Sequence, residues 1–154
     1  MFQRTRGFTL VELMVAVAVL AILVTVAAPV FTSSIQKTRA DSEASDLMRA
    51  LNYTRLEAIN RGVNVRIAPT AAGGSWTQEL TTRLSPAGNV LRVTPAMSTA
   101  ATVASNNVAF IEFNNLGGLA SPAANTTLTF VEGAYTNAVT VCLTGRIVLN
   151  GVCQ

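Results

Sequence analysis

Glu12 stands out first for its chemistry, because it is a carboxylate inside a long apolar run. The run extends over residues 8–31, and its other polar or helix-breaking residues are Thr9, Thr25 and Pro29. A charge at that depth is costly, and ionisable groups inside membrane segments usually mark function. Glu12 is therefore the first candidate functional residue. The alternative is a glutamate near a helix end whose polar tip reaches the membrane interface.

The rest of the chain offers little for catalysis. It contains no histidine, so the commonest general base and the commonest metal ligand are both missing from the sequence. The acids beyond residue 31 are few and scattered, whereas an enzyme needs an acid–base pair, a nucleophile–base pair or a metal site with its members in reach. We therefore expect no enzyme, no metal and no cofactor.

The net charge does not predict a nucleic-acid-binding protein. It is +3, from 11 basic and 8 acidic residues. Arg4 and Arg6 precede the apolar run, and removing residues 1–7 leaves nine basic against eight acidic residues. The outer part of the chain is therefore close to neutral.

The apolar run over residues 8–31 predicts a transmembrane helix. As a helix it would span about 36 Å, enough to cross a bilayer. The basic Arg4 and Arg6 before it predict a cytoplasmic N-terminus, with the chain beyond residue 31 outside. The alternative is an ordinary secretory signal cleaved near Val26–Ala28. Against it, Pro29 would follow the cut directly and Glu12 would interrupt the apolar core.

The sequence G-F-T-L-V-E, from Gly7 to Glu12, resembles the class III signal of type IV pilins and type II secretion pseudopilins. The resemblance implies that a prepilin peptidase cuts between Gly7 and Phe8, removes the leader 1–7 and methylates the new amine of Phe8. It further implies that Glu12 pairs with the Phe8 amine of a neighbouring subunit during assembly, since a buried carboxylate needs a cationic partner. Pro29 matches the proline at which pilin helices bend.

Beyond the run, residues 33–60 show the period of an amphipathic helix, and Gly62 is a suitable C-cap. We expect residues 32–62 to continue the first helix, with its inner face formed by Ala40, Ala44, Leu47, Leu51 and Ala58 and widened by Met48 and Ile59. Leu56–Gly62 also resembles the stretch that closes this helix in GspH-type pseudopilins and FimU/FimT minor pilins. The resemblance implies a pilin-like lollipop.

Residues 63–154 alternate apolar and polar side chains in short runs, as β-strands do. We expect an α+β fold in which an antiparallel sheet of about six to eight strands covers the second half of the helix. The candidate strands are residues 63–67, 90–93, 108–113, 127–131, 139–141 and 147–149. Residues 114–118 predict a turn, and residues 71–74 and 94–107 predict loops. Trp76 should pack against the sheet; the alternative is a recognition role.

Cys142 and Cys153 are the only cysteines, and in an extracytoplasmic domain they favour a disulfide, with two free thiols as the alternative. FimU/FimT minor pilins resemble this arrangement of a late disulfide.

Gly145-Arg146 resembles the start of a G-R-x-R motif of DNA-uptake pilins. Here Val148 replaces the second arginine, so Arg146 is expected to be a turn residue more than a phosphate contact.

The resemblance therefore implies a minor pilin that joins the type IV pilus, helps prime its assembly and supports motility or adhesion. It would be a single-pass inner-membrane protein with its C-terminal domain in the periplasm. Its partners would be prepilin peptidase, the assembly platform, the major pilin and other minor pilins. One alternative is a GspH-type pseudopilin of the type II secretion system; another is a DNA-binding minor pilin for uptake, which would contact nucleic acid.

Overall fold

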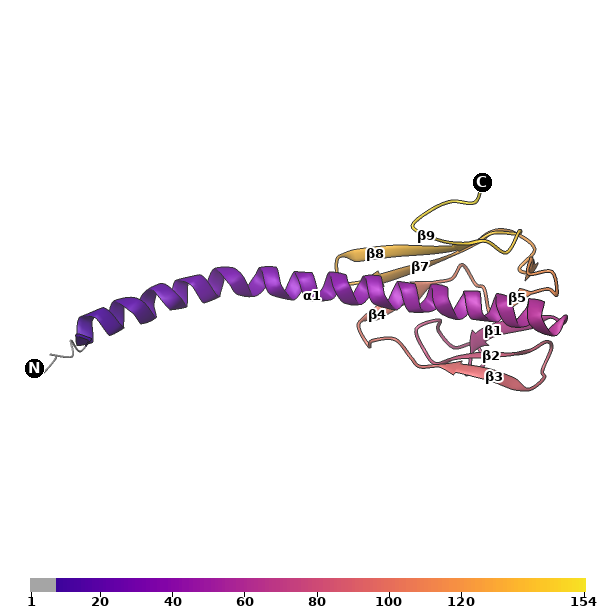
Figure 1. Cartoon of the computed structure of the whole chain (residues 1–154), viewed down its shortest axis with the longest axis horizontal. Coiled ribbons are helices and arrows are strands. Elements are labelled where there is room, and N and C mark those ends of the chain that lie inside the picture. Colours follow the sequence, from indigo (N-terminus) through magenta and orange to yellow (C-terminus); the bar gives the residue numbers. More distant parts are fainter. Residues whose placement is uncertain (1–7) are drawn as a thin grey trace, which may run out of the picture. The chain divides into compact units, whose positions relative to one another are not determined.

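The computed structural model describes residues 8–154, and for residues 26–30 it describes the backbone only. Gly7 and the rest of the predicted leader lie outside the described residues. Within the described residues, a single helix is followed by strands (Figure 1). The elements are α1 (Leu10–Arg61), β1 (Val65–Pro69), β2 (Leu80–Leu84), β3 (Val90–Thr94), β4 (Ala101–Ala104), β5 (Ile111–Phe113), β6 (Leu119–Ser121), β7 (Thr126–Glu132), β8 (Tyr135–Val141) and β9 (Ile147–Leu149).

The chain divides into two compact units, residues 1–35 and residues 36–154, and α1 belongs to both. The helix continues through Pro29, whose side chain lies outside the described part, so the bend expected there stays a prediction. At its other end α1 stops at Arg61. Gly62 follows with φ of 66° and donates its N–H to the Ile59 carbonyl at 3.3 Å. This confirms Gly62 as the C-cap.

Among the residues that the structure describes, no helix is both long enough and apolar enough to qualify as a membrane span. The span expected over residues 8–31 includes residues 26–30, whose side chains are not described, and it stays a prediction.

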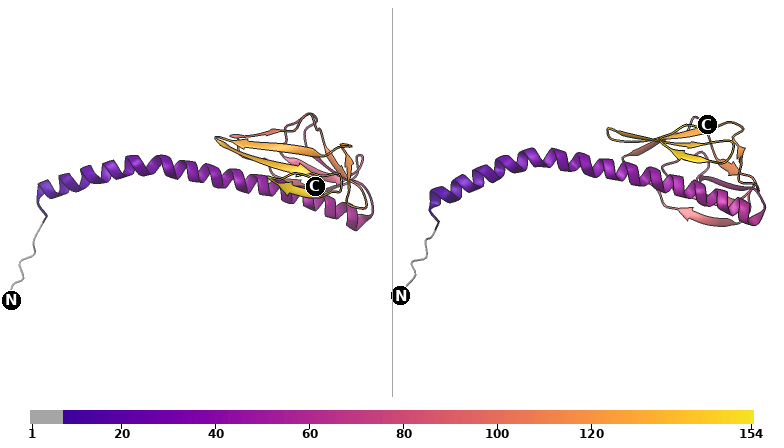
Figure 2. Two further views of the ribbon diagram at one scale, coloured as in Figure 1. Left: turned by 90° about the horizontal axis from the view of Figure 1, so that it is seen from above. Right: turned by 45° about the horizontal axis from the view of Figure 1, so that its top comes forward.

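The strands of the second unit form two antiparallel sheets. Sheet A has the order β3-β2-β1-β5-β6, and sheet B has the order β4-β7-β8-β9. Both sheets can be followed along the second half of α1 in two further views (Figure 2). The expected α+β fold with antiparallel strands on the second half of α1 is confirmed, whereas the expectation of one sheet with six to eight strands was wrong, because the described chain has nine strands in two sheets. Strands β2 and β6 were not predicted, and β4 lies within residues 94–107, which were expected to be a loop.

One face of α1 supplies the centre of the core. Its buried side chains follow the predicted helical period and contact both sheets. They are Ala40, Ala44, Leu47, Leu51 and Ala58, each with at most 1% of its surface exposed. Met48 packs partly against this core, as expected. Ile59 does not widen the buried face, because it lies at the helix end and is 41% exposed.

Hydrogen bonds tie α1 to each sheet inside the second unit. The buried hydroxyl of Thr54 lies 3.0 Å from that of Thr82 on β2 and donates to the Ala50 carbonyl of its own helix. On the other sheet, Asn137 of β8 donates to the Asp41 carboxylate at 3.1 Å. These bonds satisfy buried polar groups that would otherwise destabilise the fold.

The last turns of α1 carry a surface ion pair. The Arg61 Nε lies 2.6 Å from the Glu57 carboxylate, and this hydrogen bond lowers the pKa of Glu57. Partial burial, with Glu57 beside it, raises the pKa of Tyr53, so its phenol stays protonated at neutral pH. The basic residue at the helix end also suits the negative end of the helix dipole.

Trp76 packs into the core, as predicted. It is 2% exposed and belongs to the larger core cluster. Its indole N–H donates to the carbonyl of Val108 at 2.7 Å, which satisfies the polar atom that burial would otherwise leave unpaired. Because it is the only tryptophan, its fluorescence reports on unfolding of this unit.

The helix face can be tested with two leucines of α1. Leu51 is fully buried and Leu56 is 56% exposed. We expect Leu51→Ala to lower the free energy of unfolding by about 2–5 kcal/mol, through lost burial and a residual cavity. The control Leu56→Ala should change it by less than about 1 kcal/mol. Denaturant unfolding of the whole chain in detergent, followed by Trp76 fluorescence, measures both, and equal effects would contradict the described face.

Candidate functional site

Glu12 and Thr9 form a reciprocal cap at the start of α1. The Glu12 carboxylate accepts the backbone N–H of Thr9 at 2.9 Å and its hydroxyl at 2.9 Å. In return the backbone N–H of Glu12 donates to the Thr9 hydroxyl at 3.2 Å. This is a capping box, in which the N-cap and the third residue of the helix satisfy each other's free donors. Within this chain, Glu12 therefore orders the first turn of α1.

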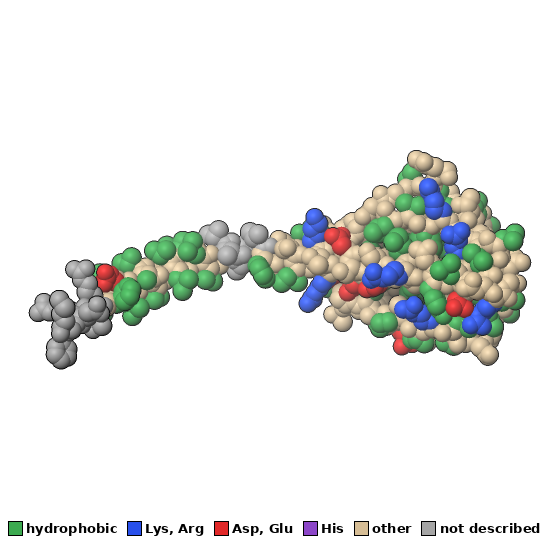
Figure 3. All heavy atoms as spheres, in the orientation of Figure 1, with side chains coloured by type: hydrophobic (Ala, Val, Ile, Leu, Met, Phe, Trp, Pro, Cys, Tyr) green, Lys and Arg blue, Asp and Glu red, His purple; other side chains and the backbone are tan. Residues whose placement is uncertain are grey.

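The side chains that follow Glu12 are apolar and exposed. Leu13, Met14, Leu20 and Ile22 are each about 60% exposed, and Phe8 before the helix is 89% exposed. The space-filling view shows apolar side chains along this part of α1 (Figure 3). Apolar surface of this extent requires another apolar environment, which lipid or packed helices can supply.

The two cysteines form a disulfide, as expected. Cys142 and Cys153 are 11 residues apart, with their Cα atoms 5.6 Å apart. The bridge joins the end of sheet B to the C-terminal tail. Arg146 holds the same tail, because its guanidinium donates to the Val152 carbonyl at 3.0 Å. Its position between β8 and β9 agrees with the expectation of a turn residue.

Arg66, Arg83 and Arg92 lie on sheet A, whereas Arg146, the residue considered for DNA contact, lies between β8 and β9 of sheet B. Arg92 on β3 stacks over the Tyr53 ring, whereas Arg146 holds the C-terminal tail. Arg66 and Arg83 face each other across β1 and β2. Arg66 is also neutralised by the Glu112 carboxylate, 3.3 Å away.

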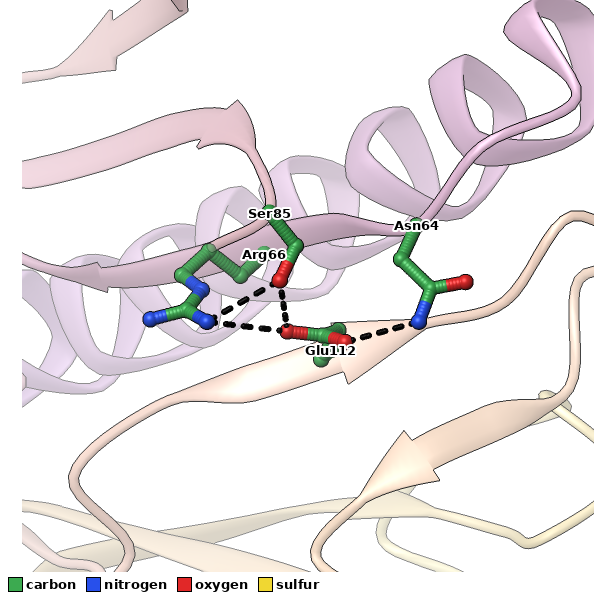
Figure 4. Close-up of polar contacts among 4 residues, drawn as sticks. All are labelled: Asn64, Arg66, Ser85 and Glu112. Carbon is green, nitrogen blue, oxygen red and sulfur yellow. Dashed lines mark hydrogen bonds and ion pairs between the residues drawn. The ribbon is translucent and has the colours of Figure 1, made fainter. Parts of the chain in front are cut away.

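A polar network surrounds that ion pair on sheet A (Figure 4). Arg66 donates to the Ser85 hydroxyl at 2.9 Å, and Ser85 donates to Glu112. Asn64 donates to the other oxygen of Glu112 at 2.8 Å. The Arg66 guanidinium also lies 4.5 Å from the centre of the Phe110 ring. These contacts engage both charges in joining β1, β2 and β5.

The close approach of two glycines near the disulfide was not predicted. Gly145 has φ of +80°, and a Cβ there would lie 1.7 Å from the Gly117 carbonyl oxygen. That same oxygen accepts a hydrogen bond from Arg55 of α1 at 2.9 Å. The turn before β9, the turn before β6 and the helix thus meet at one point. Nothing in the spacing of these glycines along the sequence indicates that meeting.

The fold and the capped N-terminal segment define a class: pilin-like proteins with a long helix packed on antiparallel sheets. Comparisons identify the family. Residues 43–145, more than half of the chain, match the family described as Type II transport protein GspH. Residues 2–28 match the prokaryotic N-terminal methylation motif. The chain belongs to the GspH family, whose members are structural pilins and pseudopilins and not enzymes.

Solved structures show the same fold. Two crystal structures of the type IV minor pilin FimU from Pseudomonas aeruginosa strain PAO1 are similar to this chain. The first gives a TM-score of 0.65 at 21% identity and covers 73% of this chain and 88% of that one. The second gives a TM-score of 0.62 at 22% identity and covers 71% of this chain and 90% of that one. No curated protein matches the chain.

The close approach of Gly145 to the Gly117 carbonyl, called here the glycine meeting point, can be tested with a matched control. Gly73 has φ of +72° and no atom within 4 Å of its would-be Cβ, whereas Gly145 has the Gly117 oxygen in that space. We expect Gly73→Ala to lower the free energy of unfolding by about 1–2 kcal/mol through backbone strain alone. Gly145→Ala should cost about 1–3 kcal/mol more, because the methyl forces the two turns apart. The unfolding assay described for Leu51 measures the difference, and equal losses would contradict this contact.

Proposed function

We propose that the chain is a minor pilin that co-assembles into the type IV pilus and helps to prime its assembly. The observation that carries the proposal is the Glu12 carboxylate at the start of a helix whose apolar side chains are exposed. Such a helix supports lateral packing between subunits, and a single acid within it can fix the register of that packing.

The proposed processing creates the partner of Glu12. A prepilin peptidase cuts between Gly7 and Phe8, so that Phe8 gains a free amine, which is then methylated. In the membrane, Thr9 supplies hydrogen bonds to the carboxylate. In the fibre, the Phe8 amine of a neighbouring subunit supplies the opposite charge, and a misplaced subunit would leave both charges unpaired at a cost of several kcal/mol.

The same proposal places the protein in the inner membrane before assembly. The helix over residues 8–31 is the anchor, and the domain over residues 63–154 is periplasmic. The partners are the prepilin peptidase, the assembly platform, the major pilin and other minor pilins, and the role supports motility or adhesion. The match to the N-terminal methylation motif over residues 2–28 supports this placement.

A type II secretion pseudopilin is the second candidate, since the matched family carries the description of a type II transport protein. Both roles use the same processing and the same helix packing. The identity of the fibre that contains the chain separates them. A DNA-uptake role has less support, because Arg146 is engaged with the C-terminal tail and Val148 stands where the second arginine would be.

Glu12→Gln tests the proposal, because it removes the negative charge and keeps the shape of the side chain. We expect the variant to reach the membrane at the normal level but to enter sheared fibres about tenfold less or worse, because the neighbouring amine loses its counter-charge. Glu79→Gln is the control, since it changes the same side chain at an exposed position outside the helix. Immunoblots of membrane and fibre fractions measure both variants. Normal entry of Glu12→Gln into fibres would contradict the proposed role of Glu12.

A further inference from the structure

A groove with a volume of about 460 Å³ lies between α1 and the end of β3 in the second unit. Its floor is apolar, formed by Leu47 and Leu80, which are almost fully buried, and by the partly buried Met97. Acidic and basic side chains lie close together over this part of α1 and the neighbouring strands (Figure 3). The groove is therefore an apolar depression with a charged rim.

Contacts between α1 and sheet A hold the groove in shape. At one side the Arg92 guanidinium lies 5.0 Å from the centre of the Tyr53 ring. Further along α1, the Glu43 carboxylate accepts the backbone N–H of Ser98 at 3.0 Å. Both contacts join the helix to the chain in and after β3. The groove is thus formed before any partner arrives, which lowers the entropic cost of binding.

Two polar side chains of the groove, Arg92 and Thr94, have no charged or hydrogen-bonding side-chain partner among the described residues. Arg92 forms no salt bridge with any carboxylate of the described chain. The Thr94 hydroxyl is buried and has no hydrogen-bond partner among the described residues. In the strand register, Arg92 lies opposite Thr82, and Thr94 lies opposite Leu80. Thr82 and Leu80 are buried. Because residues opposite each other point to the same side of a sheet, Arg92 and Thr94 share the face of β3 that Thr82 and Leu80 share on β2. A carboxylate could accept hydrogen bonds from both.

The acids on the rim contact other groups and not Arg92. Asp46 forms an ion pair with Arg49, one turn further along α1. Glu43 is engaged by Ser98. The positive charge of Arg92 is therefore available to an acid from outside the chain.

The strand beside the groove is also open to pairing. β3 is an edge strand of sheet A, so one side of its backbone has no strand partner. Val90 and Val93 on this edge are 54% and 49% exposed. Edge strands with apolar side chains invite pairing with another chain, and an added strand places alternate side chains on one face. A small acid could satisfy Arg92 but not the free edge of β3.

We propose that β3 and this groove receive an extended acidic segment from a different pilin subunit in the fibre. The segment pairs with β3, places a carboxylate between Arg92 and Thr94, and sets an apolar side chain on the floor at Leu47, Leu80 and Met97. The edge strands β3, β4, β6 and β9 of this chain contain no acid, so pairing of β3 with an edge strand of a second copy would leave Arg92 without a carboxylate. The inference rests on the proposed assembly into a fibre.

Photo-crosslinking of the full chain in its native membrane and fibre tests the proposal. A photoreactive residue replaces Ala96, which is exposed and lines the groove. We expect an adduct with another pilin or pseudopilin, identified by mass spectrometry of a crosslinked peptide that contains Asp or Glu. Arg92→Gln should reduce the adduct about tenfold, as loss of a charge-assisted hydrogen bond predicts. The control Arg83→Gln removes a charge from β2 outside the groove and should leave the adduct unchanged.

Thr94→Val separates binding from folding. Because the Thr94 hydroxyl has no partner within the described chain, this substitution should leave the unfolding midpoint unchanged or raise it. It should nevertheless reduce the adduct several-fold. An adduct that survives both Arg92→Gln and Thr94→Val overturns the proposal, as does an adduct only with a second copy of this chain or with a protein outside the fibre. If the chain enters fibres but forms no adduct, only this inference fails; if it never enters a fibre, the proposed function fails as well.

Discussion

Both sheets of the domain pack on a single face of α1, and small side chains make that face possible. Ala40, Ala44 and Ala58 have no exposed surface, so strands from both sheets can approach the helix backbone closely. Leu47 and Leu51 fill the space between them and join the larger core cluster. A larger side chain at the alanines would push the sheets away from α1, because protein interiors are close-packed. The positions of both sheets, of the groove and of the glycine meeting point follow from this packing.

The side chains of α1 differ in burial along the length of the helix. From Ala40 onward its inner face is buried within its own domain, whereas side chains near its start, such as Leu13 and Leu20, remain exposed. The start therefore holds most of the apolar surface that other molecules can cover. Glu12 interrupts this surface with a charge that its own chain partly satisfies through Thr9. The capping box gives the T-L-V-E sequence a physical role within one subunit, beside the role proposed for it between subunits.

Much of the helix could be predicted from the sequence, because local patterns determine it. The period of Ala40, Ala44, Leu47, Leu51 and Ala58 identified the buried face, and Gly62 identified the end. The strands were harder, since β4 has only Ala, Thr and Val, and β6 is a three-residue strand set by its pairing with β5. Alternation within one strand carries no information on which sheet it joins. The partner of Arg66, the contact of Gly145 with Gly117 and the groove beside β3 depend on residues far apart in the chain, so no local pattern could reveal them.

We propose that this chain is processed and assembled as a pilin, with Glu12 one turn from a newly formed amine. Mass spectrometry of the N-terminal peptide of the native protein, taken from its membrane and its fibre, tests that claim most directly. We expect a peptide that begins with N-methylated Phe8. A peptide that begins with Met1 would show that no cleavage occurs. One that begins with Pro29 would show an ordinary secretory signal, and either result would contradict the role given to Glu12.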